Sequence, residues 1–405
     1  MNAAALFFWA CVLLVLYTYV LYPLAIWLLA RVFPQRTSTG QSLPSAVSFV
    51  VAARAEGERV AERAEELKQQ LDAASLCGEV IVVLDGPGTP EHVVQRMIGR
   101  DIQVHALPER CGKAAAISAG AKLAQHQILA LADVRQRWQP DALGYLIESF
   151  RDARIGAVSG DLVLEPSPGV TAGVGLYWRY EKWLRRNEAE FDSVVGLTGA
   201  ICAVRRNLFH GIPAGTVLDD VYWPLQVVMQ GYRVGHNARA RAFDRLPDNA
   251  RDEFRRKVRT LSGNFQLVTR LPALLLPWKN RLWWQFLSHK LMRLVVPWLL
   301  LIALVTSAMV PTALFIVLFW CQLAFYTLNL LLLATGSAGH HRLTAAAASF
   351  VVLNLAALVA FWVWISGSLE KNWGVVRYDG AAGGGTAGAD GHAGRLCSIT
   401  EKETP

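Results

Sequence analysis

The stretch that decides the fold runs from Cys111 to Leu143 and reads CGKAAAISAGAKLAQHQILALADVRQRWQPDAL. Lys113 opens a segment of small residues with helical spacing, and residues 128–132 have the composition of a short buried strand that ends at Asp133. In open α/β sheets, ligands bind at the carboxyl ends of the strands. A lysine at a helix start and an acid at a strand end therefore favour a phosphate-bearing ligand. For this stretch alone, a solvated turn is the alternative interpretation.

Three more short apolar runs precede this stretch, and helical segments alternate with them. Residues 46–52, 79–84 and 103–107 are predicted as buried strands. The alternation predicts an α/β fold with a doubly wound, mainly parallel sheet. Asp85 follows the second of these strands, as Asp133 follows the fourth. A single acid of this kind is usually a turn former, but two in successive units converge on one edge of a parallel sheet.

Two adjacent carboxylates, Asp219 and Asp220, directly precede a predicted helix over residues 221–231. One interpretation is a pair of helix N-terminal acids that the macrodipole favours. The other is a general base, which would deprotonate a hydroxyl group of a bound substrate. Further along the chain, Arg256 and Arg259 share a face of a cationic helical segment. Such a face suits diphosphate oxygens, solvent or a membrane surface.

Hydrophobic residues make up 53% of the 405-residue chain, more than is usual in soluble proteins. The excess is concentrated in three runs without any charged side chain, over residues 1–30, 294–339 and 343–369. Because about 20 apolar residues span a bilayer, these runs predict about four spans, two of them in the second run with Pro311 between them. The first run lacks a basic start and a cleavage site, which favours a retained anchor over a signal peptide.

Basic side chains follow the first run and precede the second: Arg31, Arg36, Lys279, Arg281, Lys290 and Arg293. By the positive-inside rule, this pattern places the intervening segment in the cytoplasm. The net charge of +8 suits anionic lipid headgroups or a diphosphate. Nucleic acid is not an expected partner, because no basic-aromatic binding motif accompanies the charge. The six cysteines show no paired spacing, so neither a disulfide framework nor a zinc site is indicated.

These patterns divide the chain into five expected parts. They are an N-terminal transmembrane helix (1–32), a cytoplasmic α/β domain (44–265), amphipathic interfacial helices (266–293), C-terminal transmembrane helices (294–368) and a disordered Gly/Ala-rich tail (380–405). The side of the membrane on which the tail lies stays open. Four spans place it outside, whereas Lys371 and Arg377 favour the inside.

Taken together, these residues resemble the membrane-bound family 2 glycosyltransferases, in the branch of cellulose, hyaluronan and poly-N-acetylglucosamine synthases and ceramide glucosyltransferase. The resemblance covers about residues 44–300 and implies a GT-A nucleotide-sugar-binding fold. Glu56 stands at the family's strand-end acid, with Ala55 replacing the usual Asn. Asp85 matches the acid that contacts the nucleotide base and ribose. Lys113 belongs to the family's GK pair.

Further along, Asp133 matches the first acid of the DxD motif, which holds metal and diphosphate in the family. Asp220, preceded by Asp219, matches the Asp of the ED motif, the presumed catalytic base. Arg256 and Arg259 fall where the (Q/R)xxRW motif is expected. The resemblance therefore implies that these residues serve the donor and the reaction.

Two departures from the family pattern affect the expected chemistry. Arg135 replaces the second acid of DxD, which removes an oxygen ligand for a cation and supplies a guanidinium for the diphosphate. The resemblance implies Mg²⁺ or Mn²⁺ with Asp133 as its ligand, and Arg135 leaves metal dependence open. Thr260 replaces the Trp of (Q/R)xxRW. That change favours a limited transfer to a lipid-linked or membrane-proximal acceptor over processive synthesis.

The sequence thus predicts a multi-pass enzyme of the inner (plasma) membrane with a cytoplasmic catalytic domain. It would move a sugar from a nucleoside-diphosphate sugar to a lipid-linked or glycan acceptor, with inversion, in polysaccharide or glycolipid biosynthesis. Asp220 would be the base, beside Asp219. The expected substrate-binding residues are Glu56, Asp85, Lys113, Asp133, Arg135, Arg256 and Arg259.

Two other functions compete with this one. A catalytically degenerate protein would sense nucleotide-sugar or act as a scaffold of a polysaccharide assembly complex, as the altered DxD would allow. Retention of Asp220, where a base is needed, argues against it. A transporter is disfavoured, because the predicted spans carry no intramembrane charge.

Overall fold

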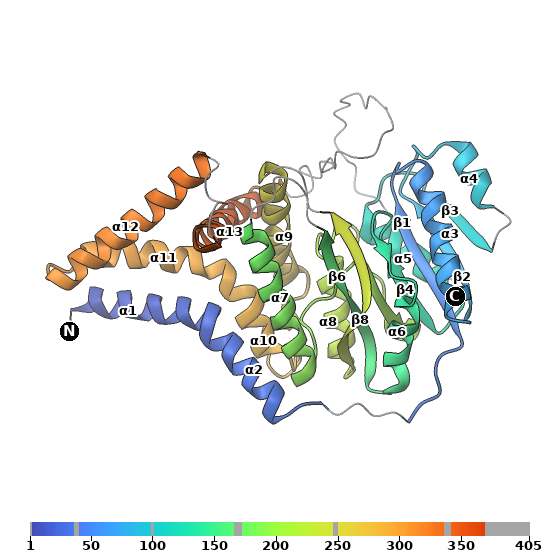
Figure 1. Ribbon diagram of the computed structural model, residues 1–405, viewed down its shortest axis with the longest axis horizontal. Coiled ribbons are helices and arrows are strands. Elements are labelled where there is room, and N and C mark those ends of the chain that lie inside the picture. Colours follow the sequence, from blue (N-terminus) through green and yellow to red (C-terminus); the bar gives the residue numbers. More distant parts are fainter. Residues whose placement is uncertain are drawn as a thin grey trace, which may run out of the picture.

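A computed structural model describes residues 2–35, 40–98, 101–165, 172–245, 250–335 and 342–368. A twisted sheet with helices on both faces forms one end of the molecule, and long apolar helices form the other (Figure 1). The expected tail (380–405), with Lys371 and Arg377 before it, lies outside the described residues, as does Arg36.

The sheet has eight strands in the order β3-β2-β1-β4-β7-β6-β8-β5. Strands β3, β2, β1 and β4 run parallel, β7 is antiparallel to both of its neighbours, and β8 is parallel to β6. The sheet is mixed and mostly parallel, which confirms the predicted fold class. The strands are β1 Ala46–Ala53, β2 Cys77–Leu84, β3 Ile102–Ala106, β4 Ile128–Ala132, β5 Arg137–Trp138, β6 Ile155–Glu165, β7 Ile201–Arg205 and β8 Arg233–Arg245.

Helices cover both faces of this sheet, as a doubly wound fold requires. One face packs under α3 and α6, and the other packs under α5 and α8. Because both faces are covered, the central strands are buried along nearly their whole length, and this explains their continuous apolar sequence. The helices of this domain are α3 Glu58–Ala73, α4 Glu91–Met97, α5 Lys113–Leu123, α6 Ala142–Glu148, η2 Ser149–Arg151, η3 Arg206–Leu208 and α8 Asp219–Met229.

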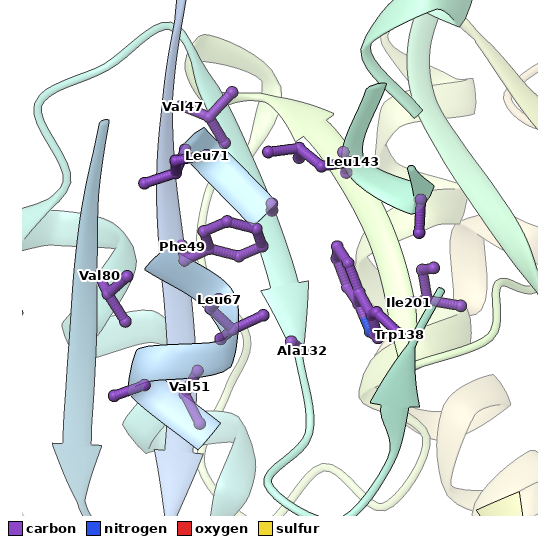
Figure 2. Close-up of a cluster of buried hydrophobic side chains, with 14 of the residues drawn as sticks. Val47, Phe49, Val51, Leu67, Leu71, Val80, Ala132, Trp138, Leu143 and Ile201 are labelled. Atoms are coloured by element: carbon purple, nitrogen blue, oxygen red, sulfur yellow. The ribbon is translucent and has the colours of Figure 1, made fainter. Parts of the chain in front are cut away.

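The core under α3 and α6 ties the end of β4 to the turn before β7 (Figure 2). In it the ring of Phe49 from β1 meets the ring of Trp138 edge-on, with 5.5 Å between their centroids. The indole N–H of Trp138 donates to the carbonyl oxygen of Ala200 at 2.9 Å. The buried ring of Trp138 therefore holds the segment after β4 and the turn before β7 in fixed positions relative to each other.

Four helices among the described residues are long and apolar enough to cross a membrane, as predicted: Ala3–Val32, Trp283–Ala308, Ala313–Ala334 and Leu343–Ile365. Their outward side chains are apolar and exposed, for example Val305 at 59% and Leu331 at 62%. A contiguous apolar surface of this kind suits hydrocarbon rather than water. The helical elements are α1 Ala3–Leu16, η1 Tyr17–Leu21, α2 Tyr22–Val32, α10 Trp283–Phe286, η5 Leu287–Leu291, α11 Met292–Ala308, α12 Ala313–Ala334 and α13 Arg342–Ile365.

Between the sheet and these apolar helices lie α7 (Ala172–Phe191) and α9 (Ala250–Arg270), followed by the short η4 (Pro272–Leu275) (Figure 1). The hydroxyl of Tyr22 on α2 donates to Glu188 of α7 at 2.6 Å, so α7 is joined directly to the first membrane helix. Residues 283–293 were expected in interfacial helices. They form the first turns of the helix that continues as α11, and several of their polar side chains are buried against α7. Their position at a membrane surface stays a prediction.

Candidate active site

Four of the predicted site residues meet at the edge of the sheet. Lys113 begins α5, Asp133 follows β4, and Asp219 and Asp220 begin α8. The Nζ of Lys113 lies 2.7 Å from Oδ1 of Asp133 and 3.5 Å from Oδ2 of Asp219. Gly199, in the turn before β7, faces the same cluster, because a Cβ added there would lie 3.5 Å from both Lys113 Nζ and Asp220 Cβ. We name Lys113, Asp133, Asp219 and Asp220 the acid–lysine cluster.

The position of Lys113 depends on the loop before it. Gly112 has φ +87°, a left-handed conformation that glycine adopts without steric cost. The buried carboxylate of Asp85 accepts the backbone N–H groups of Cys111 at 2.7 Å and Gly112 at 2.8 Å. Asp85 therefore holds the loop that presents Lys113. Its predicted contact with the nucleotide stays a prediction.

The charges of the acid–lysine cluster shift the ionisation of its members. Burial raises the pKa of Asp220, the charge of Asp219 raises it further, and Lys113 opposes both, which leaves a pKa of about 6. Burial alone would lower the pKa of Lys113, but Asp133, Asp219 and Asp220 outweigh it and the pKa is raised. Lys113 is therefore a permanent cation, and Asp220 is a carboxylate poised to accept a proton near neutral pH.

Glu56 lies beside the acid–lysine cluster, in the loop after β1. Its carboxylate accepts the backbone N–H of Arg54. Desolvation raises the pKa of Glu56, and the charge of Asp133 adds to that shift. The preceding residue, Ala55, has φ +57°, a left-handed conformation that Asn tolerates better than Ala. The loop therefore keeps a backbone geometry that its sequence does not favour.

The predicted arginines engage other partners. Arg135 forms an ion pair with Asp244 of β8, with 2.6 Å between Nη2 and Oδ2, and Gln136 donates to the same oxygen at 3.0 Å. Arg256 pairs with Glu253, three residues before it on α9, at 2.8 Å. Arg259 is exposed one turn further along that helix. The expected contacts of Arg135, Arg256 and Arg259 with the diphosphate stay predictions.

One residue near the acid–lysine cluster was missed by sequence reasoning. Arg63 of α3 is buried, with 1% of its side chain exposed, and its Nε donates to the backbone oxygen of Asp133 at 3.1 Å. Its guanidinium also pairs with Glu66 at 2.9 Å and lies over the ring of Trp138. Arg63 thus holds the end of β4 in place from the side of the sheet that α3 covers. The available signal was an arginine on the apolar face of an otherwise amphipathic helix.

The residues present do not fit a divalent cation held by the protein, because Mg²⁺ and Mn²⁺ need several oxygen ligands in open geometry. Within the described ranges, no three His, Cys, Asp or Glu side chains are placed to hold a metal ion. The ammonium of Lys113 lies between Asp133 and Asp219, where such an ion would bind. A metal-ligand role for Asp133 stays a prediction.

Comparison with known proteins assigns this part of the chain to a family. Residues 48–212 match the family described as Glycosyl transferase family 2. Curated relatives include the poly-beta-1,6-N-acetyl-D-glucosamine synthase of Staphylococcus aureus (strain COL), with 22% identity over 213 residues, 47% of this chain and 48% of that protein. The chain thus spans about half the length of the curated relatives it matches. The match over residues 48–212 confirms the predicted resemblance to family 2 glycosyltransferases.

Among solved structures, the mannosyltransferase PcManGT from Pyrobaculum calidifontis, in complex with GDP-Man and Mn²⁺, has a similar fold. The TM-score is 0.63 at 20% identity, and the match covers 89% of this chain and 99% of that one. The likeness therefore includes the apolar helices as well as the sheet. It supports the predicted GT-A architecture with membrane helices.

Proposed function

We propose, from the family 2 domain that this chain carries, that the protein is a membrane glycosyltransferase. It would transfer a sugar from a nucleoside-diphosphate sugar to a lipid-linked or glycan acceptor. The observation that carries the proposal is the meeting of one lysine and three carboxylates in the acid–lysine cluster, at the strand ends where ligands bind in such sheets. Membrane helices on both sides of the domain suit a lipid-linked substrate.

The proposed reaction is a single displacement at the anomeric carbon of the donor. The acceptor hydroxyl oxygen attacks that carbon, and its proton passes to the carboxylate of Asp220. The bond between the anomeric carbon and the diphosphate oxygen breaks, and its electron pair leaves with the nucleoside diphosphate. Attack from the face opposite the leaving group inverts the configuration. The products are the glycosylated acceptor and the nucleoside diphosphate.

Lys113 is the proposed counter-charge of the leaving diphosphate. Its raised pKa keeps it charged at every physiological pH, and its ammonium is half-buried, where a fixed charge acts strongly. Asp85 and Glu56, on the loops after β2 and β1, are the proposed contacts of the nucleotide. Basic side chains beside the apolar helices support a cytoplasmic orientation of this domain, by the positive-inside rule.

The test of this function is nucleotide release by the detergent-purified chain from UDP-, GDP- and dTDP-sugars, with a short lipid-linked acceptor present. Release from one donor, coupled to a glycosylated acceptor, is the expected result. Binding of a donor without release or transfer would contradict the proposal and favour a nucleotide-sugar sensor or scaffold.

Nucleotide binding should tolerate removal of divalent cations. Because Lys113 lies between the acids that a cation would need, we expect the affinity for UDP or GDP in EDTA to stay within about threefold of that in Mn²⁺. Calorimetric titration of the full chain in each condition measures this. A loss of more than about tenfold in EDTA, restored by Mn²⁺, would instead assign Asp133 a metal.

The transfer rate should rise with pH through the pKa of Asp220, near 6. Below that pH the carboxyl is protonated and cannot accept the acceptor's proton, so kcat/KM should increase about tenfold from pH 5 to pH 7. Donor affinity measured over the same range is the control. A profile that is flat, or that falls with pH, would remove Asp220 from the proton transfer.

A further inference from the structure

A row of charged side chains runs along the face of α7 that meets the apolar helices. Glu181, Arg185 and Glu188 share this face, because they are spaced by four and three residues. His289 of η5 contacts both glutamates, with 2.7 Å from Nδ1 to Glu188 and 3.2 Å from Nε2 to Glu181. Arg185, which lies between the two glutamates, therefore faces η5, where Lys290 follows His289.

Both glutamates of this row already have partners, although Oε2 of Glu188 is buried without a hydrogen bond in the part of the chain that the structure describes. Glu188 accepts the hydroxyl of Tyr22 at 2.6 Å as well as His289, and Glu181 forms an ion pair with Arg293. Arg293 also donates to the hydroxyl of Tyr177, at 2.9 Å. The carboxylates of this buried network are thus engaged by partners other than Arg185 and Lys290.

Neither Arg185 nor Lys290 forms an ion pair with a carboxylate among the described residues, although the glutamates lie near them. Lys290 is half-buried and makes no hydrogen bond or ion pair within the part of the chain that the structure describes. The guanidinium of Arg185 lies over the ring of Trp178 and donates a long hydrogen bond, 3.4 Å from Nη1 to Oγ1 of Thr198, and its Nε is buried without a hydrogen-bond partner. The charge of Arg185 acts on Lys290, and the opposite charges of Glu181 and Glu188 partly offset it. Because neither cation has an ion-pair partner among the described residues, an anion that binds here would be stabilised by both.

This pair of cations lies between the acid–lysine cluster and the membrane. Thr198, which contacts Arg185, directly precedes Gly199, which faces Asp220 and Lys113. The charges of Arg185 and Lys290 both reach Asp220. Lys290 also belongs to the first turns of the membrane helix Trp283–Ala308. An anion held here would therefore be close to the proposed base and at the start of a membrane helix.

We propose that Arg185 and Lys290 bind a phosphate group in the headgroup of a lipid acceptor. The inference rests on the proposed function and names its acceptor class: a lipid that carries a phosphate beside the hydroxyl that attacks the donor. An arginine binds phosphate through two parallel N–H groups, and a lysine adds a point charge. The phosphate would anchor the acceptor and orient its hydroxyl towards Asp220.

The test measures the affinity of the detergent-purified full chain for dodecyl phosphate, dodecanol and inorganic phosphate, without any donor. We expect dodecyl phosphate to bind at least about tenfold more tightly than either of the other two, since both the charge and the chain contribute. Arg185→Gln and Lys290→Gln should each weaken its binding by about tenfold. Arg186→Gln and Lys279→Gln, the same changes at neighbouring exposed positions, should leave it within about twofold.

Several results would overturn the inference. Equal affinity for dodecyl phosphate and dodecanol would exclude a phosphate site, and equal affinity for dodecyl phosphate and inorganic phosphate would exclude a lipid headgroup. Loss of UDP or GDP binding in Arg185→Gln, with dodecyl phosphate binding intact, would assign the pair to the donor. If the Gln variants do not fold, the three probes still decide the question on the unaltered protein. Donor-dependent nucleotide release is measured separately, so failure here is distinguishable from failure of the proposed function.

Discussion

Replacement of Asp220 with Asn is expected to lower glycosyl transfer by about 10³-fold while the chain still binds the donor, because a positioned general base contributes about 10² to 10⁴ in rate. Asn keeps the size of the side chain but cannot accept a proton. The pKa of Asp220, raised by burial and by Asp219 to about 6, is suited to that role. The measurement is kcat for transfer, with donor affinity determined on the same preparation.

Asp219→Asn is the matched control for this substitution. Asp219 begins the same helix and approaches Lys113 at 3.5 Å, so its loss should weaken the electrostatics of the acid–lysine cluster and reduce the rate by only about tenfold. Equal losses in the two variants would indicate that the acids act by charge alone. Unchanged turnover in Asp220→Asn would remove it from the mechanism.

The sequence predicted those parts of the fold in which burial imposes a clear hydrophobic pattern on the residues. Strands β1, β2 and β4 are buried on both faces, so each is a continuous apolar run. Three of the membrane helices among the described residues are uncharged over the length of a bilayer, and the fourth, Trp283–Ala308, carries Lys290 and Arg293 in its first turns. The turn over residues 198–200, before β7, has no such pattern, because small residues are compatible with both a turn and a strand.

The acid–lysine cluster was predictable to a similar degree. Residues at the carboxyl ends of parallel strands and at the starts of the following helices converge whatever their separation in sequence, which is why Lys113, Asp133 and Asp220 could be grouped. The pairing of Arg135 with Asp244 could not be foreseen, since β8 reaches this edge from more than a hundred residues away. Which charges are paired is decided by tertiary packing rather than by any local period.

The environment of Arg185 and Lys290 likewise could not be predicted from the sequence. In the sequence, Lys290 was one of several basic residues before a span and served only to orient the protein. Packing of α7 against η5 gives both glutamates of the facing row partners other than Arg185 and Lys290. Burial without a partner, rather than charge itself, is therefore the feature that separates a ligand-binding cation from a topological one.

Replacement of Lys113 with Met should weaken the binding of the donor at the acid–lysine cluster. Met keeps the apolar stem of the side chain but removes the cation that lies 2.7 Å from Asp133 and 3.5 Å from Asp219. We expect nucleoside-diphosphate affinity to fall at least about tenfold and transfer to fall about 10²-fold, as for the loss of a preorganised counter-charge. Lys122→Met, an exposed position on the same helix, is the control and should change neither.

The pH dependence of stability gives Lys113→Met a second, independent readout. Without the ammonium, Asp220 loses the charge that lowers its pKa, so this pKa rises further above that of the unfolded chain. Groups with a raised acid pKa destabilise the fold as pH rises through the unfolded value and they must ionise while buried. The Tm deficit of the variant relative to the unaltered protein should therefore be larger at pH 7.5 than at pH 5. A deficit that is the same at both pH values, together with unaltered nucleotide binding, would mean that Lys113 is a surface residue of no consequence to the site.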